Sequence, residues 1–390
     1  MEFTPKSEID RRVASLQKAL GEQGVEAALI IQNVDLLYFA GTAQAGFLFI
    51  PSAGKPFLAI RRSYERAKEE SPLEDIVPFE RTEEVVKMAA ERGYPELGSL
   101  GLELDVLPAS LYLRYQRLFP RARLLDISGI IRSLRMVKSP HEISQIAEAS
   151  RRNTFFLRSV KDYLREGISE LYLAGQLEAV ARRNGHQGLV RMRRFNQEIF
   201  YGHLMSGENL AVPSFLESPT GGLGLGPAFP QGPGFKTITR NEPVLVDYVG
   251  VYAGYMADET RIFCVGDLPE HLKRAHEVAR VIQAHLQSLG KPGTPCEELY
   301  RKAVEIAAEA GLKDNFMGYA GFVGHGVGLE LDELPVIAPG SSTPLQEGMV
   351  FALEPKFIFP EGAVGVENTF VVTADGLKRF STFPDDIVTL

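Results

Sequence analysis

Hydrophobic and polar positions in the first 130 residues alternate between helical and strand-like spacing. Apolar residues at positions 9, 13, 16 and 20 share one face of a predicted helix that Ser7 caps and that ends at Gly21 or Gly24. The apolar runs AALII, GFLFI and PFLAI predict strands at 27–31, 46–50 and 56–60, and the residues SAGK join the last two as a hairpin. Further helix and strand signals continue to residue 127, so this part is predicted to be a small α/β domain.

A second domain is predicted from residue 135. Ser139, Pro140 and Glu142 have the spacing of a helix N-cap, a first-turn proline and a capping box, which marks the start of a new helix. We therefore divide the chain into residues 1–134 and 135–390. The elements predicted for the second domain are helices over 140–163, 168–184, 269–289 and 295–310, strands near 190–204, and hairpins over 243–265 and 348–373.

Residues 219–234 are rich in glycine and proline and predict a loop. Their GLGLG segment does not indicate a nucleotide site, because a dinucleotide-binding motif needs a strand before it and a helix after it, and the prolines forbid that helix.

Composition narrows the functional classes. The chain has 390 residues, 45% hydrophobic and 24% charged, as in an ordinary soluble protein of two domains. Its 42 basic and 50 acidic side chains give a formal net charge of −8, so neither nucleic acid nor a membrane surface is an expected partner. No apolar run approaches the roughly 18 residues of a membrane-spanning helix, and the polar amino terminus does not resemble a signal peptide. Two cysteines cannot form a disulfide framework, so we expect a cytoplasmic protein.

Two predicted hairpins each carry a pair of carboxylates among apolar neighbours. With a turn centred on Tyr252 and Ala253, Asp247 and Asp258 are predicted to lie directly opposite each other on one face, with Cβ atoms about 4.5–5.5 Å apart. A turn at residues 360–362 likewise places Glu354 opposite Glu367. The second half of the chain therefore contains two hairpins that each present facing acids.

Facing carboxylates on an apolar surface need protons or cations to neutralise them, because like charges repel and burial removes their hydration. Oxygen ligands together with one imidazole suit Mn²⁺, Fe²⁺, Co²⁺ or Zn²⁺. His325, which glycines flank on both sides in GHGVG, is the candidate imidazole. A single acid or histidine is more often an ordinary structural residue, but two matched hairpins and this histidine together indicate a two-metal site that shares a bridging water.

Three segments of the chain resemble the metal-binding motifs of the pita-bread metallopeptidases, which include prolidase, aminopeptidase P, methionine aminopeptidase and the metal-free creatinase. The segments are VLVDYVGVYAGYMADETRIF, GHGVGLELDELP and EGMVFALEP…GVENTFVVT. The KSPHEI linker and the α/β domain before it resemble the two-domain members. The resemblance implies a creatinase-type α/β N-terminal domain, residues 1–134, and an α+β pita-bread catalytic domain, residues 135–390.

The same resemblance implies a set of site residues. By similarity, the five metal ligands are Asp247, Asp258, His325, Glu354 and Glu367, and Glu354 also carries the proton of the bridging water. The implied cofactors are two divalent ions (Mn, Co, Fe or Zn), and the implied assembly is a homodimer. Creatinase shares the fold but has lost these ligands, so their presence argues against creatine chemistry.

The substrate-binding residues depart from the pattern of prolidase-like relatives. Ser214 and Asp332 stand where those relatives carry histidines that hydrogen-bond the scissile carbonyl, and Val336 and Gly365 stand where they often carry arginine. An ionised aspartate only accepts hydrogen bonds, and arginine is suited to capturing a carboxylate. His203, in EIFYGHLMSG, is the candidate replacement for one histidine. We therefore take Glu354, His203 and Asp332 as the candidate catalytic residues.

The sequence thus predicts a dinuclear metallohydrolase of the Xaa-Pro dipeptidase or aminopeptidase P type, acting on a small molecule or a short peptide. Two alternatives stay open. The first is a C–N hydrolase or lyase of the same fold with a non-peptide substrate, and the second is a metal-binding pseudoenzyme. A metal assay separates an enzyme from a metal-free binding module, and a dipeptide panel separates the peptidase from the non-peptide enzyme.

Overall fold

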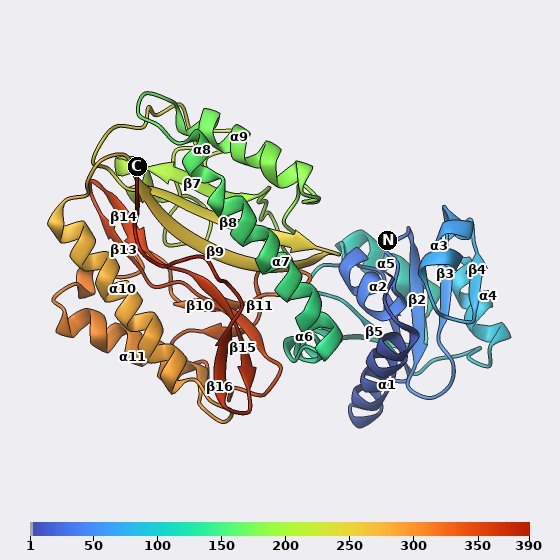
Figure 1. The fold of residues 1–390 in the computed structure, drawn as a ribbon. Coiled ribbons are helices and arrows are strands. Elements are labelled where there is room, and N and C mark those ends of the chain that lie inside the picture. Colours follow the sequence, from blue (N-terminus) through green and yellow to red (C-terminus); the bar gives the residue numbers. More distant parts are fainter. Residues whose placement is uncertain (1–2) are drawn as a thin grey trace. The chain divides into compact units, whose positions relative to one another are not determined.

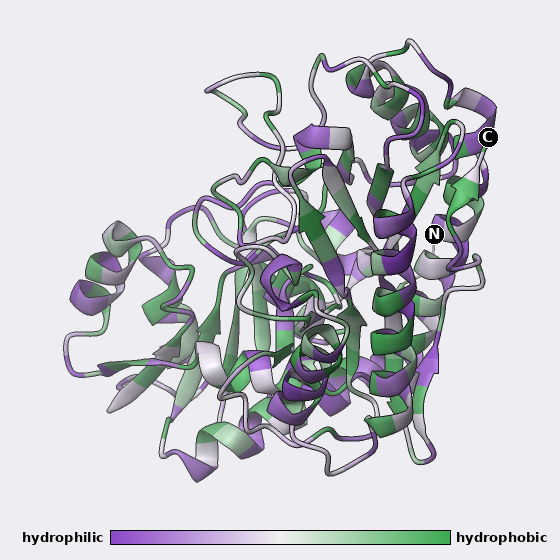
Figure 2. Ribbon diagram, turned by 90° about the vertical axis from the view of Figure 1, so that its left-hand side faces the viewer, coloured by the Kyte–Doolittle hydropathy of each residue, from purple (hydrophilic) through white to green (hydrophobic). Residues whose placement is uncertain are grey.

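The computed structural model describes residues 3–390, which form two compact units, one ending at Arg135 and the other beginning at Met136 (Figure 1). The strands of both units are largely hydrophobic and the helices alternate between hydrophobic and hydrophilic residues, as Figure 2 shows. This is the pattern of helices that cover a sheet on one face and meet water on the other. No helix in the described part of the chain is long and apolar enough to cross a membrane.

The first unit is an α/β domain built on one mixed sheet, as predicted. Its elements are α1 (Lys6–Glu22), β1 (Ala27–Ile30), α2 (Asn33–Ala40), β2 (Gly46–Pro51), β3 (Phe57–Ile60), α3 (Tyr64–Glu70), β4 (Ile76–Pro78), α4 (Glu84–Glu91), β5 (Ser99–Leu102), α5 (Ala109–Leu118), β6 (Arg123–Asp126) and α6 (Ser128–Met136). The six strands lie in the order β4-β3-β2-β1-β5-β6, and β2 and β3 form the predicted antiparallel hairpin. One detail was wrong, because α1 begins before Ser7 and its N-cap position is Pro5.

A buried group of charges lies inside the first unit. Arg135 Nη1 is 2.7 Å from Asp35 Oδ1, and both side chains are almost fully buried. Glu103 Oε2 accepts hydrogen bonds from the backbone N–H groups of Ile31 (2.7 Å) and Gln32 (3.1 Å). Burial, together with the neighbouring Asp35, raises the pKa of Glu103 well above its ordinary value. At pH values between the ordinary and the raised pKa, the folded unit therefore binds more proton at Glu103 than the unfolded chain does.

We expect the stability of the first unit to fall as the pH rises from the ordinary glutamate pKa towards the raised pKa of Glu103. In that window the folded state binds more protons than the unfolded state, and one such group contributes up to about 1.4 kcal/mol per pH unit. Glu103→Gln keeps an acceptor and a donor without titrating, so it should flatten this dependence. Hydrogen exchange of the Ile31 and Gln32 amides across the window measures it. Equal pH slopes in the two proteins would contradict the expectation.

The second unit contains the remaining elements. They are α7 (Pro140–Arg158), α8 (Val160–Tyr163), α9 (Glu170–Arg183), β7 (Gly202–Ser206), the 3₁₀ helix η1 (Gly207–Ala211), β8 (Val244–Tyr252), β9 (Tyr255–Cys264), α10 (Glu270–Leu289), α11 (Cys296–Glu309), η2 (Lys313–Asn315), β10 (Gly324–Gly326), β11 (Glu333–Ile337), β12 (Val350–Leu353), β13 (Lys356–Phe359), β14 (Gly362–Gly365), β15 (Asn368–Thr373), β16 (Gly376–Arg379) and β17 (Val388–Thr389). The predicted capping box at the start of α7 is present, because the Ser139 and Glu142 side chains each accept a hydrogen bond from the other's backbone N–H.

Two sheets and a two-stranded ribbon form the framework of this unit. The strand orders are β17-β9-β8-β7 and β11-β10-β12-β15-β16, and β13 pairs with β14. Helix α7 contacts β8 and β9, and α10 packs on α11 beside the C-terminal strands (Figure 1). Both sheets have apolar cores, so the unit is an α+β domain as predicted. Residues 219–234 form a loop without helix or strand, also as predicted.

Candidate metal and active site

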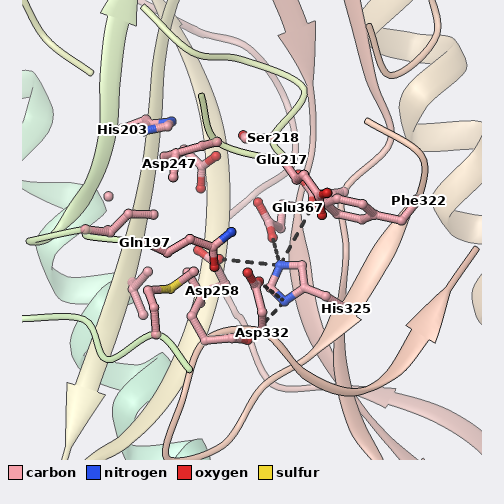
Figure 3. A pocket seen from close by; sticks show the side chains of 17 residues that line it. Gln197, His203, Glu217, Ser218, Asp247, Asp258, Phe322, His325, Asp332 and Glu367 are labelled. Carbon is pink, nitrogen blue, oxygen red and sulfur yellow. Dashed lines mark hydrogen bonds and ion pairs between the residues drawn. The ribbon is translucent and has the colours of Figure 1, made fainter. Parts of the chain in front are cut away.

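The five residues that the sequence predicts as metal ligands come together in the second unit. Asp247 lies on β8 and Asp258 on β9, while His325 lies on β10 of the other sheet. Glu354 directly follows β12 and Glu367 directly precedes β15. All five line one cavity, and Figure 3 labels four of them, Asp247, Asp258, His325 and Glu367. The site is therefore assembled where the two sheets meet, and the long strands β8 and β9 supply Asp247 and Asp258.

The register of the first hairpin differs from the prediction. In the structure Asp247 pairs with Thr260 and Asp258 pairs with Val249, so the two acids are not directly opposite. The turn consists of Ala253 and Gly254, both with positive φ (49° and 87°), which shifts the pairing by one residue along each strand. Two-residue hairpin turns favour this left-handed backbone because it matches the strand twist. The acids still share one face as diagonal neighbours, so they enter the same cavity.

The second hairpin keeps the predicted register. Leu353 pairs with Asn368 on one side of the acids and Lys356 pairs with Gly365 on the other. Glu354 and Glu367 occupy the break between these two ladders, across from each other as predicted. Both acids line the cavity.

His325 presents one ring nitrogen to three carboxylates. Its Nε2 is 3.8 Å from Asp258 Oδ2, 3.6 Å from Glu354 Oε1 and 3.8 Å from Glu367 Oε1. The other nitrogen, Nδ1, lies 3.1 Å from the Leu331 carbonyl oxygen, to which it donates in the tautomer that leaves Nε2 free as a ligand. Burial alone lowers the pKa of His325, but the nearby acids outweigh burial and raise it.

Lys356 is a residue of this site that the sequence reading missed. Its Nζ is 2.8 Å from Asp247 Oδ2, 2.7 Å from Glu354 Oε2 and 3.1 Å from Glu367 Oε2, and its side chain is 0% exposed. The signal was present in FALEPKF, because alternate residues of an extended chain share a face and Lys356 stands two positions after Glu354.

The electrostatics follow from this cluster. Burial raises the pKa of Asp258 well above its ordinary value, and Glu367 and Asp247 add to the shift. Burial also raises the pKa of Glu367, to about 8. At Asp247 burial acts in the same direction, but the Lys356 ammonium outweighs it and lowers the pKa. The Lys356 ammonium thus forms ion pairs with Asp247, Glu354 and Glu367. Asp258 lies on the other side of the cluster, near His325.

The donor set fits a divalent metal ion. Asp258, His325 and Glu367 each bring one ligand atom within 4.8 Å of the others. Glu367 Oε1 is buried and accepts no hydrogen bond from any described residue, whereas Glu367 Oε2 accepts one from Thr260 Oγ1 (2.7 Å). Buried carboxylate oxygens are normally paired, so the free oxygen beside His325 indicates a cation position.

Surrounding polar groups hold the acids in place. The Thr369 hydroxyl accepts a hydrogen bond from the Asp258 backbone N–H at 2.9 Å. Arg261 is fully buried, and its guanidinium donates to the carbonyl oxygens of Thr260 (2.7 Å) and Glu367 (2.8 Å). Such outer contacts orient the ligands of metal sites.

Of the other residues that the sequence analysis singles out, His203 and Asp332 line the cavity and Ser214 does not. His203 pairs with Asp247 across β7 and β8, lines the cavity, and has its Nε2 3.2 Å from Gln231 Oε1; burial lowers its pKa and favours the neutral ring. Asp332 also lines the cavity, with Oδ1 3.6 Å from His325 Nδ1. Ser214 is absent from the described lining, and its Oγ accepts from the Leu216 backbone N–H. A serine there does not occupy the place of a histidine donor.

Neither of the two positions where relatives often carry arginine has a side chain that could take the place of arginine. Val336 pairs with His325 across β10 and β11. Gly365 faces Lys356, and a Cβ at residue 365 would lie 2.6 Å from Lys356 Cγ and 2.5 Å from the Pro355 carbonyl oxygen. A side chain at residue 365 and the Lys356 side chain therefore exclude each other.

Comparison with known proteins agrees with this geometry. The model of metallopeptidase family M24 matches residues 144–374, and the model of the creatinase/prolidase N-terminal domain matches residues 12–137. The chain is 28% identical to the Xaa-Pro dipeptidase of Pyrococcus furiosus, over 95% of this chain and 97% of that protein. It is also 28% identical to the Xaa-Pro dipeptidase of Lactobacillus delbrueckii subsp. lactis, over 94% and 95%.

Solved structures show the same similarity. A Xaa-Pro dipeptidase from Bacillus anthracis superposes with a TM-score of 0.84 at 25% identity, covering 98% of this chain and 100% of that one. A prolidase from Pyrococcus furiosus superposes with a TM-score of 0.79 at 27% identity, covering 94% and 99%. The predicted fold, a creatinase-type domain followed by a pita-bread domain, is confirmed.

Proposed function

The chain belongs to metallopeptidase family M24 and is a metal-dependent hydrolase of that family, and we propose on this premise that it cleaves an amide bond of a short peptide. The observation that carries the proposal is the convergence of His325 with the carboxylates of Asp258, Glu354 and Glu367 at the wall of one cavity. A divalent ion bound there supplies a Lewis acid and lowers the pKa of a water molecule.

The residues of the chain then have separate roles. Glu354, whose Oε1 faces His325 and whose Oε2 faces Lys356, holds and passes on the proton of the attacking water. His203, whose neutral ring burial favours, donates its Nε2–H to Gln231 Oε1 at the cavity wall, and a substrate carbonyl would have to replace Gln231 as the acceptor. Asp332 is partly exposed at the same cavity and attracts a cationic group of the substrate, such as a peptide amine.

The specificity we propose is not that of an ordinary prolidase. Asp332 only accepts hydrogen bonds while ionised, Ser214 lies outside the described lining, and Gly365 leaves no room for an arginine. The pocket therefore lacks the expected donors for a scissile carbonyl and a C-terminal carboxylate. These observations also favour the second candidate function, a C–N hydrolase acting on a non-peptide amide that carries a cation.

Several finer features belong to the same proposal. We propose that residues 1–134 form an auxiliary domain and that residues 135–390 perform the catalysis, because all five candidate metal ligands lie in the latter part. We call these five residues the cage: Asp247, Asp258, His325, Glu354 and Glu367. The metal is Mn, Co, Fe or Zn, as oxygen-rich sites with one imidazole favour. The two ions, the homodimer and the cytoplasmic location predicted from the sequence stay predictions.

Metal loading should raise both stability and activity. Protein supplied with Mn²⁺ or Co²⁺ is expected to melt at a higher temperature than chelated protein, with about 2.7 kcal/mol of added stability at free metal 100 times its dissociation constant. The loaded protein should hydrolyse members of a panel of dipeptides and cationic amides that the chelated protein leaves intact. Calorimetry and product analysis test this. Melting curves and hydrolysis that are both indifferent to chelator and to metal would contradict the proposed function.

A further inference from the structure

Lys356 stands where a second metal ion would have to bind. Its Nζ lies 2.7–3.1 Å from one oxygen each of Asp247, Glu354 and Glu367. A metal ion would bind such carboxylate oxygens at about 2.0–2.2 Å. An ion held by these three oxygens would overlap the ammonium nitrogen, so ion and ammonium compete for one place.

The ammonium is held firmly in that place. Lysine has three N–H donors, and here three carboxylate oxygens receive them. The residue is paired with Gly365 in the β13–β14 ribbon, and its carbonyl oxygen accepts a hydrogen bond from the Met317 backbone N–H at 2.9 Å. Moving the side chain away would break three charge-assisted hydrogen bonds of a fully buried charge, which is costly.

The oxygens of the cage divide into two sets around this ammonium. Glu354 and Glu367 each turn Oε2 to Lys356 and Oε1 to His325. Asp258 Oδ2 completes the set around His325 Nε2, 3.8 Å away. On that side, Glu367 Oε1 is buried and accepts no hydrogen bond from the described residues. On the Lys356 side of the cage, the ammonium is therefore the cation that the carboxylate oxygens bind. On the His325 side, the oxygens and Nε2 are arranged as ligands for a metal ion.

We propose that the Lys356 ammonium replaces one of the two ions predicted from the sequence, so that the cage binds a single divalent ion through His325, Asp258, Glu354 and Glu367. This rests on the proposed function only in taking the cage to bind divalent metal. Because all three N–H groups of Lys356 point at carboxylates, none is left for a substrate. Lys356 is thus a positioning residue that neutralises Asp247 and fixes the Oε2 atoms of the two glutamates.

Metal counting tests the proposal without any assay of activity. Native protein, Lys356→Ala, Lys356→Arg and Lys236→Ala are dialysed against excess Mn²⁺, and bound metal per chain is measured by elemental analysis. Lys236, which pairs with Glu242 at 2.7 Å outside the cage, is the matched control for removing a paired ammonium. Native protein, Lys356→Arg and Lys236→Ala should bind one ion per chain, and Lys356→Ala should bind a second. Electron paramagnetic resonance should show isolated Mn²⁺ in the first three and a spin-coupled pair in Lys356→Ala.

The other outcomes separate this proposal from the proposed function. Two ions in the native protein would overturn the role of Lys356 and leave metal-dependent hydrolysis standing, and this result needs no variant to fold. A folded Lys356→Ala that still binds one ion would also overturn it. Native protein that binds no ion under these conditions would instead remove the premise, the metal cage itself.

Discussion

Asp258→Asn is expected to abolish metal-dependent hydrolysis and to change stability in opposite directions with and without metal. Asp258 faces His325 Nε2 at 3.8 Å on the side of the cage that lacks an internal cation. Losing a charged ligand should weaken metal binding by at least the roughly 10–100-fold that outer contacts contribute. In chelated protein, however, the same change removes an acid whose ionisation burial and the neighbouring acids oppose in the folded state, and it should raise the melting temperature.

The opposite changes in melting temperature with and without metal make this test specific for a metal ligand. A residue with only a structural role would lower the melting temperature in both conditions, and an inert residue would change neither. Asp267→Asn is a suitable control, because this exposed acid pairs with Lys273 away from the cage and should leave metal binding intact. Calorimetry with chelator and with Mn²⁺, together with elemental analysis, measures both effects. An Asp258→Asn chain with native metal content would show that Asp258 is not a ligand.

The sequence predicted the membership of the site better than its geometry. Facing acids on two hairpins identified Asp247, Asp258, Glu354 and Glu367, because side-chain alternation along a strand is strict. The register of the first hairpin depended on whether Tyr252 or Gly254 joined Ala253 in the turn. A single-residue change in the turn centre decides that, and Ala253 with positive φ (49°) is an uncommon choice for a residue with a Cβ.

Lys356 was missed for a different physical reason. A lysine at the start of a strand is ordinarily a solvated side chain, and the alternation in FALEPKF places Lys356 on the face of Glu354 without showing that it is buried. Its burial depends on three carboxylates, one from β8 and two from the second hairpin, which only the folded chain brings together. Gly365 stands where relatives often carry an arginine, and across the strand pair its missing side chain leaves the space that the Lys356 side chain occupies.

Asp332→His is expected to raise the turnover of Xaa-Pro dipeptides, which we expect the native chain to cleave weakly or not at all. Asp332 lines the same cavity as the candidate metal ligands, and its Oδ1 lies 3.6 Å from His325 Nδ1. An ionised carboxylate there accepts hydrogen bonds and repels a developing oxyanion, whereas a neutral histidine donates. One such donor is typically worth about 10²–10³ in turnover, so the gain should be of that order.

Two control variants separate the effect of gaining a hydrogen-bond donor at residue 332 from the effect of losing the aspartate charge. Asp332→Asn removes the charge and supplies a weaker donor, so it should fall between the native chain and Asp332→His. Glu217→Gln removes an acid that also lines the cavity but pairs with Arg194, and it should change Xaa-Pro turnover little. Equal metal content in all variants has to be verified, because Asp332 contacts the metal-ligand candidate His325. If the native chain turned over Xaa-Pro substrates and Asp332→His did not increase that turnover, another residue would already replace the missing histidine. His203, on the same cavity wall beside Asp247, would then be the residue to mutate next.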